Sequence, residues 1–115
     1  MSLTANKLRI CHVVDYLMPL MGYQELLLPK WNAKHGHEVH IVTSDRYAPT
    51  PGYEQTWGQF LGPRQRQAGV EYVENLPVHR LRCRWEWKAR PWLIRLEREV
   101  KTLGPDVIFC HGTAS

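Results

Sequence analysis

The sequence predicts a doubly wound α/β domain, with an open and mainly parallel sheet in strand order 3-2-1-4 and helices on both faces. The class follows from the alternation of short apolar segments, typical of buried strands, with two segments of helical period. Residues 8–45 alone contain a strand, a turn with a glycine, a helix and a second strand, in that order. Because parallel strands need such a crossover, we expect one right-handed βαβ unit there.

The first helix is expected over residues 22–35, between a strand at Leu8–Tyr16 and a strand at His37–Asp45. Gly22 suits the N-cap position, and Gly36 suits the left-handed position after the last turn. Pro29 removes one helical hydrogen bond, so we expect either a kinked helix or two short helices broken at Leu28. Helical spacing of apolar residues predicts which ones face the sheet, namely Tyr23, Leu27 and Trp31.

The remaining elements are expected from residue 46 onward. Residues 46–67 are rich in proline and glycine and predict a long connection with one helical turn. Residues 70–83 predict the third strand region, in two extended pieces near a sheet edge because of Pro77. A second helix is expected from Pro91 to Leu103, and a last strand at residues 106–110. We expect all four strand regions in one parallel sheet, with the first strand inside it.

Composition limits the classes of function. The chain has 115 residues, which suits one domain, and it has no apolar run of the roughly 20 residues that cross a bilayer. No secretion signal is recognisable, so we expect a cytosolic protein with reduced core thiols at Cys11, Cys83 and Cys110. A formal charge of +4 and a pI near 9.2 favour a polyanionic partner, such as nucleic acid, anionic lipid or a phosphorylated sugar.

Three segments carry a resemblance to a known family: the Gly22-Tyr23-Gln24-Glu25 helix start after Asp15, the run His35-Gly36-His37-Glu38-Val39 before Thr43-Ser44-Asp45, and Gly104-Pro105-Asp106-Val107-Ile108-Phe109-Cys110-His111-Gly112. Together they resemble the N-terminal domain of GT-B glycosyltransferases, in the retaining family that includes glycogen synthases and phosphatidylinositol mannosyltransferases. The resemblance implies that residues 1–115 form a single partial Rossmann-like domain on the acceptor side, without the C-terminal donor domain.

The resemblance also implies an enzyme and its substrates. The full-length protein would transfer a sugar from a nucleotide-sugar donor to a hydroxyl acceptor with retention, and this chain alone would be inactive. No cofactor or metal is expected. The acceptor can be anionic or lipid-linked, which would bring the protein to the inner face of the membrane. We also expect homodimers, because the last strand would leave an open sheet edge.

The expected site lies beyond the carboxyl ends of the first and fourth strands. A helix N-terminus at Gly22 favours a phosphate, and by resemblance Met21 and Gly22 face the donor diphosphate. His111 matches the family histidine that contacts the transferred sugar. Gly22 as a plain helix cap and His111 as a hydrogen-bonded strand-end residue are the alternatives. The residues expected to bind the acceptor are Asp15, Tyr16, Tyr23, Arg84, Trp85, Gly112 and Thr113.

Two other groups of residues leave alternatives open. His35, His37 and His40 lack metal-ligand spacing, since residues 37 and 40 point to opposite faces of a strand. Arg80, Arg82 and Arg84 are expected on one strand face, followed by Trp85, Trp87 and Trp92. This pattern suits an acceptor, a lipid surface or RNA, or else a solvated face with tryptophans packed inward. A small basic module that binds nucleic acid or another polyanion is therefore the second hypothesis, and a response-regulator-like domain a weaker third.

Overall fold

The computed structural model describes residues 7–17, 24–47, 52–55, 58–87 and 90–110. Within these ranges one five-stranded sheet has the order β3-β4-β2-β1-β7, and every neighbouring pair is parallel except β3 and β4. The strands are β1 (Arg9–Val13), β2 (Glu38–Ser44), β3 (Gly69–Val73), β4 (Leu76–Leu81) and β7 (Val107–Cys110). The predicted α/β class, with β1 inside the sheet, is confirmed at this level.

The strand order differs from the predicted order 3-2-1-4, and the sheet is mixed. The predicted third strand region, which was expected in two extended pieces, forms two antiparallel strands, because Glu74 and Asn75 close a two-residue turn with φ of 49° and 68°. Positive φ at both central residues gives the turn a twist that matches a hairpin. β3 therefore runs antiparallel to β4 and forms one edge of the sheet, while β7 forms the other.

Helix α1 (Gln24–Lys34) is a single helix that continues through Pro29. The prediction that Leu27 and Trp31 face the sheet is wrong, since 55% and 58% of their surfaces are exposed. Leu26 and Pro29 are buried instead, and Ala33 packs against the core. These three positions share one helical face, one step around from the predicted one. Gly36 has the expected positive φ of 88° after the helix, whereas Gly22 and Tyr23 lie outside the described residues.

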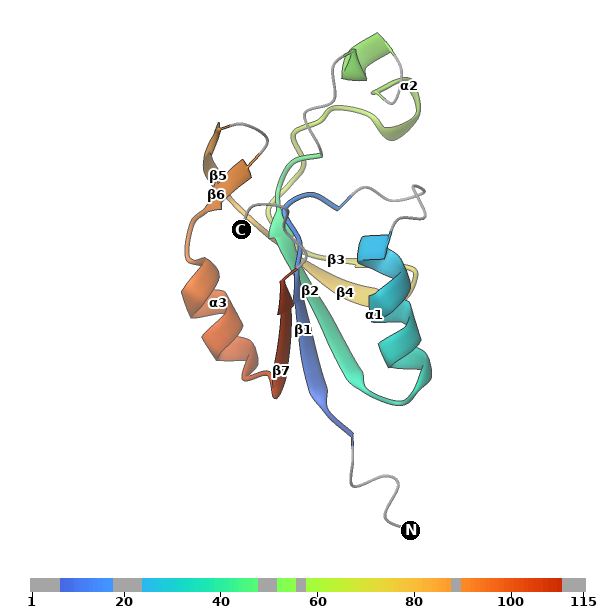
Figure 1. The fold of residues 1–115 in the computed structure, drawn as a ribbon. Coiled ribbons are helices and arrows are strands. Elements are labelled where there is room, and N and C mark those ends of the chain that lie inside the picture. Colours follow the sequence, from blue (N-terminus) through green and yellow to red (C-terminus); the bar gives the residue numbers. More distant parts are fainter. Residues whose placement is uncertain (1–6, 18–23, 48–51, 56–57, 88–89, 111–115) are drawn as a thin grey trace.

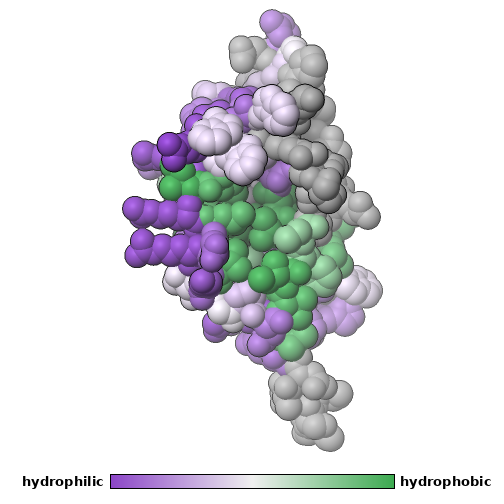
Figure 2. Space-filling view, turned by 60° about the vertical axis from the view of Figure 1, so that its left-hand side comes forward, coloured by the Kyte–Doolittle hydropathy of each residue, from purple (hydrophilic) through white to green (hydrophobic). Residues whose placement is uncertain are grey.

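The hydrophobic core lies between α1 and the sheet. It joins side chains of β2 and β4 to the helix and to the segment after β1: Val14, Leu17, Leu26, Val39, Ile41, Leu76 and Val78. Figure 1 shows α1 on one side of the sheet and α3 (Leu96–Leu103) on the other. No residue of α3 is buried, and Ile94 and Ile108 are 38% and 49% exposed. Figure 2 shows apolar side chains across the middle of this less covered face.

The second predicted helix begins later than expected. Residues Pro91 to Leu93 belong to strand β6 (Arg90–Leu93), which pairs with β5 (Cys83–Trp87) in a separate two-stranded sheet. Helical spacing of apolar residues could not exclude this pairing, because the cross-strand contact of Trp85 with Trp92 depends on tertiary structure. The helix ends as expected, at Gly104 with φ of 59°. Helix-like turns η2 (Tyr53–Gln55) and α2 (Gly58–Leu61) lie in the predicted long connection.

Candidate functional site

The carboxyl ends of β1, β2, β4 and β7 lie at one edge of the sheet, where open α/β sheets bind their ligands. Figure 1 shows the β5–β6 hairpin and α2 standing at this end of the molecule. The chain leaves β1 through Asp15 and Tyr16, and leaves β2 through Asp45 and Arg46. Segments far apart in the sequence therefore meet at this edge.

Glu86, the last but one residue of β5, is the centre of a polar cluster at this edge. One carboxylate oxygen, Oε2, accepts hydrogen bonds from the Tyr16 hydroxyl at 2.5 Å and from Arg64 Nη2. The other, Oε1, accepts from Arg46 Nη1 at 2.7 Å. The Glu86 side chain is only 15% exposed, and protein donors form hydrogen bonds with both of its oxygens. We refer to these four residues as the Glu86 cluster.

The Glu86 cluster changes the protonation of its members. Burial raises the pKa of the Tyr16 phenol to about 12, and the nearby Arg64 opposes this only in part. Burial also lowers the pKa of Arg64. At neutral pH Tyr16 is therefore a neutral donor to Glu86, whose single negative charge faces two guanidinium groups. One excess positive charge is left beside a cavity of about 630 Å³ lined by Arg46, Gly62, Pro63 and Arg64.

Asp45 links the surrounding loops to the sheet through hydrogen bonds. It is 4% exposed, and its Oδ1 accepts a hydrogen bond from the Cys83 backbone N–H at 3.2 Å. Its Oδ2 accepts from Gln65 Nε2 at 2.9 Å, and its backbone oxygen accepts from the Arg66 N–H at 2.6 Å. A buried carboxylate that is bonded in this way holds the end of β2, the connection before β3 and the start of β5 in one arrangement.

Arg80 is not part of an exposed arginine face, and that prediction is wrong. Its side chain is 1% exposed on the α1 side of β4. Nε donates to Glu71 at 2.6 Å, Nη1 to the Ser44 carbonyl at 3.0 Å and Nη2 to the Leu17 carbonyl at 2.9 Å. The spacing of Arg80, Arg82 and Arg84 suggested one exposed strand face. Arg82, however, lies between β4 and β5, so the three arginines do not belong to one continuous strand. The role of Arg80 is structural.

The predicted acceptor residues Arg84 and Trp85 lie on the exposed hairpin. The Arg84 guanidinium lies 5.3 Å from the centre of the Trp85 ring, and the Trp85 and Trp92 rings are 5.9 Å apart. Trp85, Trp87 and Trp92 are 50%, 60% and 54% exposed, so the tryptophans are not packed inward. Since Glu86 stands between Trp85 and Trp87 on the same strand, the hairpin connects this aromatic surface to the Glu86 cluster.

The structure places only part of the predicted site. Of the predicted residues, it describes Asp15, Tyr16, Arg84 and Trp85. Tyr16 contacts Glu86 of β5, the strand that also contains Arg84 and Trp85. The remaining predicted residues lie outside the described ranges: Met21, Gly22, Tyr23, His111, Gly112 and Thr113. Arg46, Arg64 and Glu86 were not predicted as site residues. The position of Arg46 two residues after the end of β2 was an available signal, but nothing in the sequence connects Arg64 with Glu86.

The histidines and cysteines have structural contacts. His12 Nε2 is 2.8 Å from Asn32 Oδ1 of α1, and His37 Nδ1 accepts a hydrogen bond from the Leu8 N–H at 3.1 Å. Among the described residues no three His, Cys, Asp or Glu side chains are arranged to hold a metal ion. Burial raises the pKa of the Cys11 thiol to about 11, whereas Cys110 is exposed, contrary to the expected core position.

Within the ranges that the structure describes, no helix is long and apolar enough to cross a membrane. Comparison of the chain with protein-family models, with curated proteins and with solved structures found no match.

Proposed function

We propose that this chain is the acceptor-side, Rossmann-like domain of a retaining GT-B glycosyltransferase, which transfers a sugar from a nucleotide-sugar donor to a hydroxyl acceptor. The observation that carries the proposal is the parallel pairing of β1 with β7. Val13 pairs with Cys110, so β1 and β7 end at the same edge of the sheet, and the resembling motifs follow these two strand ends in the sequence. These motifs resemble the donor-phosphate loop and the sugar-contacting histidine of that family.

The charges of the Glu86 cluster support an anionic acceptor. Arg46 and Arg64 together exceed the charge of Glu86 by one, and both line the cavity beside it. The Tyr16 hydroxyl donates a hydrogen bond to Glu86, and its oxygen keeps lone pairs that can accept a hydrogen bond from a sugar hydroxyl. In this proposal the Glu86 cluster binds and orients the acceptor, and Met21, Gly22 and His111 serve the donor.

A titration of the chain followed by NMR tests the proposal. Phosphorylated sugars should shift the backbone amides of Asp15, Tyr16 and Arg46, and Arg64→Gln should weaken this binding. Lys30→Gln removes the same charge at α1, away from the cavity, and should leave it unchanged. Nucleotide sugars should bind this chain no tighter than about millimolar, which is about 4 kcal/mol of standard free energy. Shifts that avoid this edge of the sheet entirely would contradict the proposal, and micromolar binding of a nucleotide sugar would show that donor contacts are already complete.

The exposed hairpin favours a second candidate, a module that binds single-stranded nucleic acid. Tryptophan faces next to Arg84 suit base stacking and phosphate contact. In that case a labelled oligonucleotide should bind with an affinity that falls steeply with salt, and Trp85→Ala should cost roughly 1–3 kcal/mol per stacked base. Fluorescence anisotropy at two salt concentrations decides. Tight binding that Arg82→Ala plus Arg84→Ala abolishes would favour this candidate, and weak binding without salt dependence would remove it.

A further inference from the structure

We propose that the α3 side of the sheet carries a second anion site, in which Arg82, Arg95 and Arg98 bind a small phosphate-bearing molecule. A hollow of about 600 Å³ lies between the β3–β4 hairpin and the start of α3, lined by Val70, His79, Leu81, Arg82, Ile94 and Arg95. A second hollow along α3 shares Arg95 and includes Arg98. Neither hollow shares a lining residue with the cavity of the Glu86 cluster, so this site is independent of the function proposed above.

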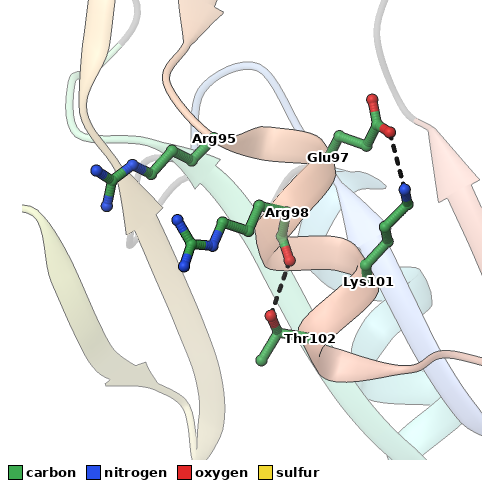
Figure 3. A pocket seen from close by; sticks show the side chains of 5 residues that line it. All are labelled: Arg95, Glu97, Arg98, Lys101 and Thr102. Carbon is green, nitrogen blue, oxygen red and sulfur yellow. Dashed lines mark hydrogen bonds and ion pairs between the residues drawn. The ribbon is translucent and has the colours of Figure 1, made fainter.

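The three guanidinium groups have no ionic or hydrogen-bonding partner in the described part of the chain. The structure pairs other arginines with carboxylates, and those are Arg9, Arg46, Arg64 and Arg80. Figure 3 shows Arg95 and Arg98 extending from α3 on the same side, toward β4, while Glu97 and Lys101 face each other on the other side of the helix. Unpaired positive charge from two separate elements is therefore directed to one region.

The described carboxylates near this region contact residues other than these three arginines. Glu99 lines the hollow, but its Oε2 lies 3.2 Å from His79 Nδ1. Glu97 Oε1 lies 3.1 Å from Lys101 Nζ, and Glu71 of β3 pairs with the buried Arg80 at 2.6 Å. None of these three carboxylates forms an ion pair with Arg82, Arg95 or Arg98, whose positive charges outnumber the single charge of Glu99 beside the hollow. An anion from solution is the partner that the arrangement lacks.

The backbone at Arg95 adds to this arrangement. Arg95 has φ of 64° and ψ of 27°, a left-handed conformation that costs a non-glycine residue about 1 kcal/mol or more. The residue precedes α3 without a side-chain hydrogen bond to the first turn, so the first N–H groups of α3 lack a side-chain acceptor. These donors and the guanidinium groups favour the same kind of ligand, an oxyanion.

The chemistry of the lining identifies the class of ligand. Guanidinium groups bind phosphate through paired N–H donors, which makes a phosphate a better ligand than a simple halide. A volume of about 600 Å³ is in the range of small-molecule sites, and Val70, Leu81 and Ile94 offer apolar surface to an organic portion. No Phe, Tyr or Trp side chain lines either hollow, whereas sites for single-stranded nucleic acid depend on stacking against such rings. We therefore assign a soluble phosphate ester or diphosphate to this site.

Inorganic pyrophosphate is the probe that tests the assignment, in calorimetry and NMR titrations of the whole chain at low salt. The amides of Gly69, Leu81 and Ile94 should shift on binding. Arg82→Gln and Arg95→Gln should each weaken binding about tenfold or more, because each removes a charged hydrogen-bond donor. Lys30→Gln is the matched control, since it removes one positive charge from α1, on the other side of the sheet, and it should change affinity less than about twofold.

Several outcomes would overturn the assignment. They are an absence of pyrophosphate binding by the unsubstituted chain, an unchanged affinity in Arg82→Gln and in Arg98→Gln, or an equal loss in Lys30→Gln. An oligonucleotide that binds through the same arginines more tightly than pyrophosphate would replace the small molecule with nucleic acid. Because Arg82, Arg95 and Arg98 are exposed, circular dichroism of each variant should match the parent, and single variants decide the question if a double variant unfolds.

Discussion

His40 Nδ1 on β2 lies 3.0 Å from His79 Nε2 on β4, so the two strands are joined by a hydrogen bond between imidazole rings. Glu38 Oε2 is 2.8 Å from His40 Nε2, and Glu99 Oε2 is 3.2 Å from His79 Nδ1. The facing nitrogens, His40 Nδ1 and His79 Nε2, share one proton in this hydrogen bond, because two opposed N–H groups would repel each other.

This pair predicts a loss of stability in mild acid. Burial, together with His40, lowers the pKa of His79 below its ordinary value of 6.5, and Glu99 opposes this. Since the unfolded chain then binds the proton more readily, stability is fully present above pH 6.5 and falls as the pH decreases below it. His79→Gln should reduce this loss between pH 7 and pH 5, as measured by urea unfolding.

His35 and Glu38 define the control variant and the lower end of the pH range for this experiment. His35→Gln changes an exposed histidine at the end of α1 and should leave the pH dependence as it is in the parent. Below pH 4.5 Glu38 also contributes, because its hydrogen bond from His40 lowers its pKa and its stabilisation disappears in acid. Equal pH dependence in the parent and in both variants would show that His79 is not the group responsible.

Adjacent leucines test the face by which α1 packs on the sheet. Leu26 is 3% exposed in the core, whereas Leu27 is 55% exposed. Leu26→Ala should lower the free energy of unfolding by about 2–5 kcal/mol, because it leaves a cavity in the core. Leu27→Ala should change it by about 0.5 kcal/mol or less. Thermal and urea unfolding of the two variants measure the difference, and the reverse ranking would restore the helix face that the sequence predicted.

Arg80 and Arg82 make a second matched pair. Arg80→Ala removes the donors that satisfy two backbone carbonyls and Glu71, so it should destabilise the fold by about 3–5 kcal/mol. Arg82→Ala, two residues away on the surface, should stay within about 0.5 kcal/mol of the parent. The midpoints of urea unfolding at constant slope provide the comparison. Similar midpoints for the two variants would mean that Arg80 is not held in the buried network.

Glu86→Gln tests the Glu86 cluster. The amide keeps the shape of the side chain but leaves two partly buried guanidinium groups without a counter-charge, so stability should fall by about 1–3 kcal/mol. The Tyr16 amide should shift in NMR spectra, because its hydroxyl loses a charged acceptor. Glu97→Gln, which removes an exposed carboxylate on α3, should produce neither change. An unshifted Tyr16 amide in Glu86→Gln would show that β5 is not part of the site.

The sequence predicted the elements whose signals are local. The first βαβ unit, the left-handed residue Gly36 and the helix end at Gly104 follow from strand composition, helical period and glycine geometry. It failed where tertiary pairing decides. Pro91 to Leu93 have a helix-compatible pattern, yet they pair with β5 and leave α3 to begin at Leu96. The turn at Glu74 and Asn75 lacks glycine, which hid the hairpin between β3 and β4.

The candidate site was predictable only in position. The rule for open α/β sheets directed attention to Asp15 and Tyr16, which do lie at the carboxyl edge. The other residues of the Glu86 cluster come from three segments, up to 70 residues from Tyr16 in the sequence, and no local pattern links them. Arg80 shows the opposite error, since its charge suggested solvent and its hydrogen bonds explain its burial.

The pairing of β1 with β7 has a consequence for the order in which the chain folds. Ile10 pairs with Val39 across one short crossover but with Val107 across almost the whole chain, a loop more than three times as long. The longer closure costs about 1 kcal/mol more in chain entropy, while β7 brings only four residues, none of them fully buried. We therefore expect β7 to join the sheet last and to detach first, as a sub-global opening that exchanges its amide hydrogens faster than β2. Such an opening would expose the β1 edge of an otherwise folded domain.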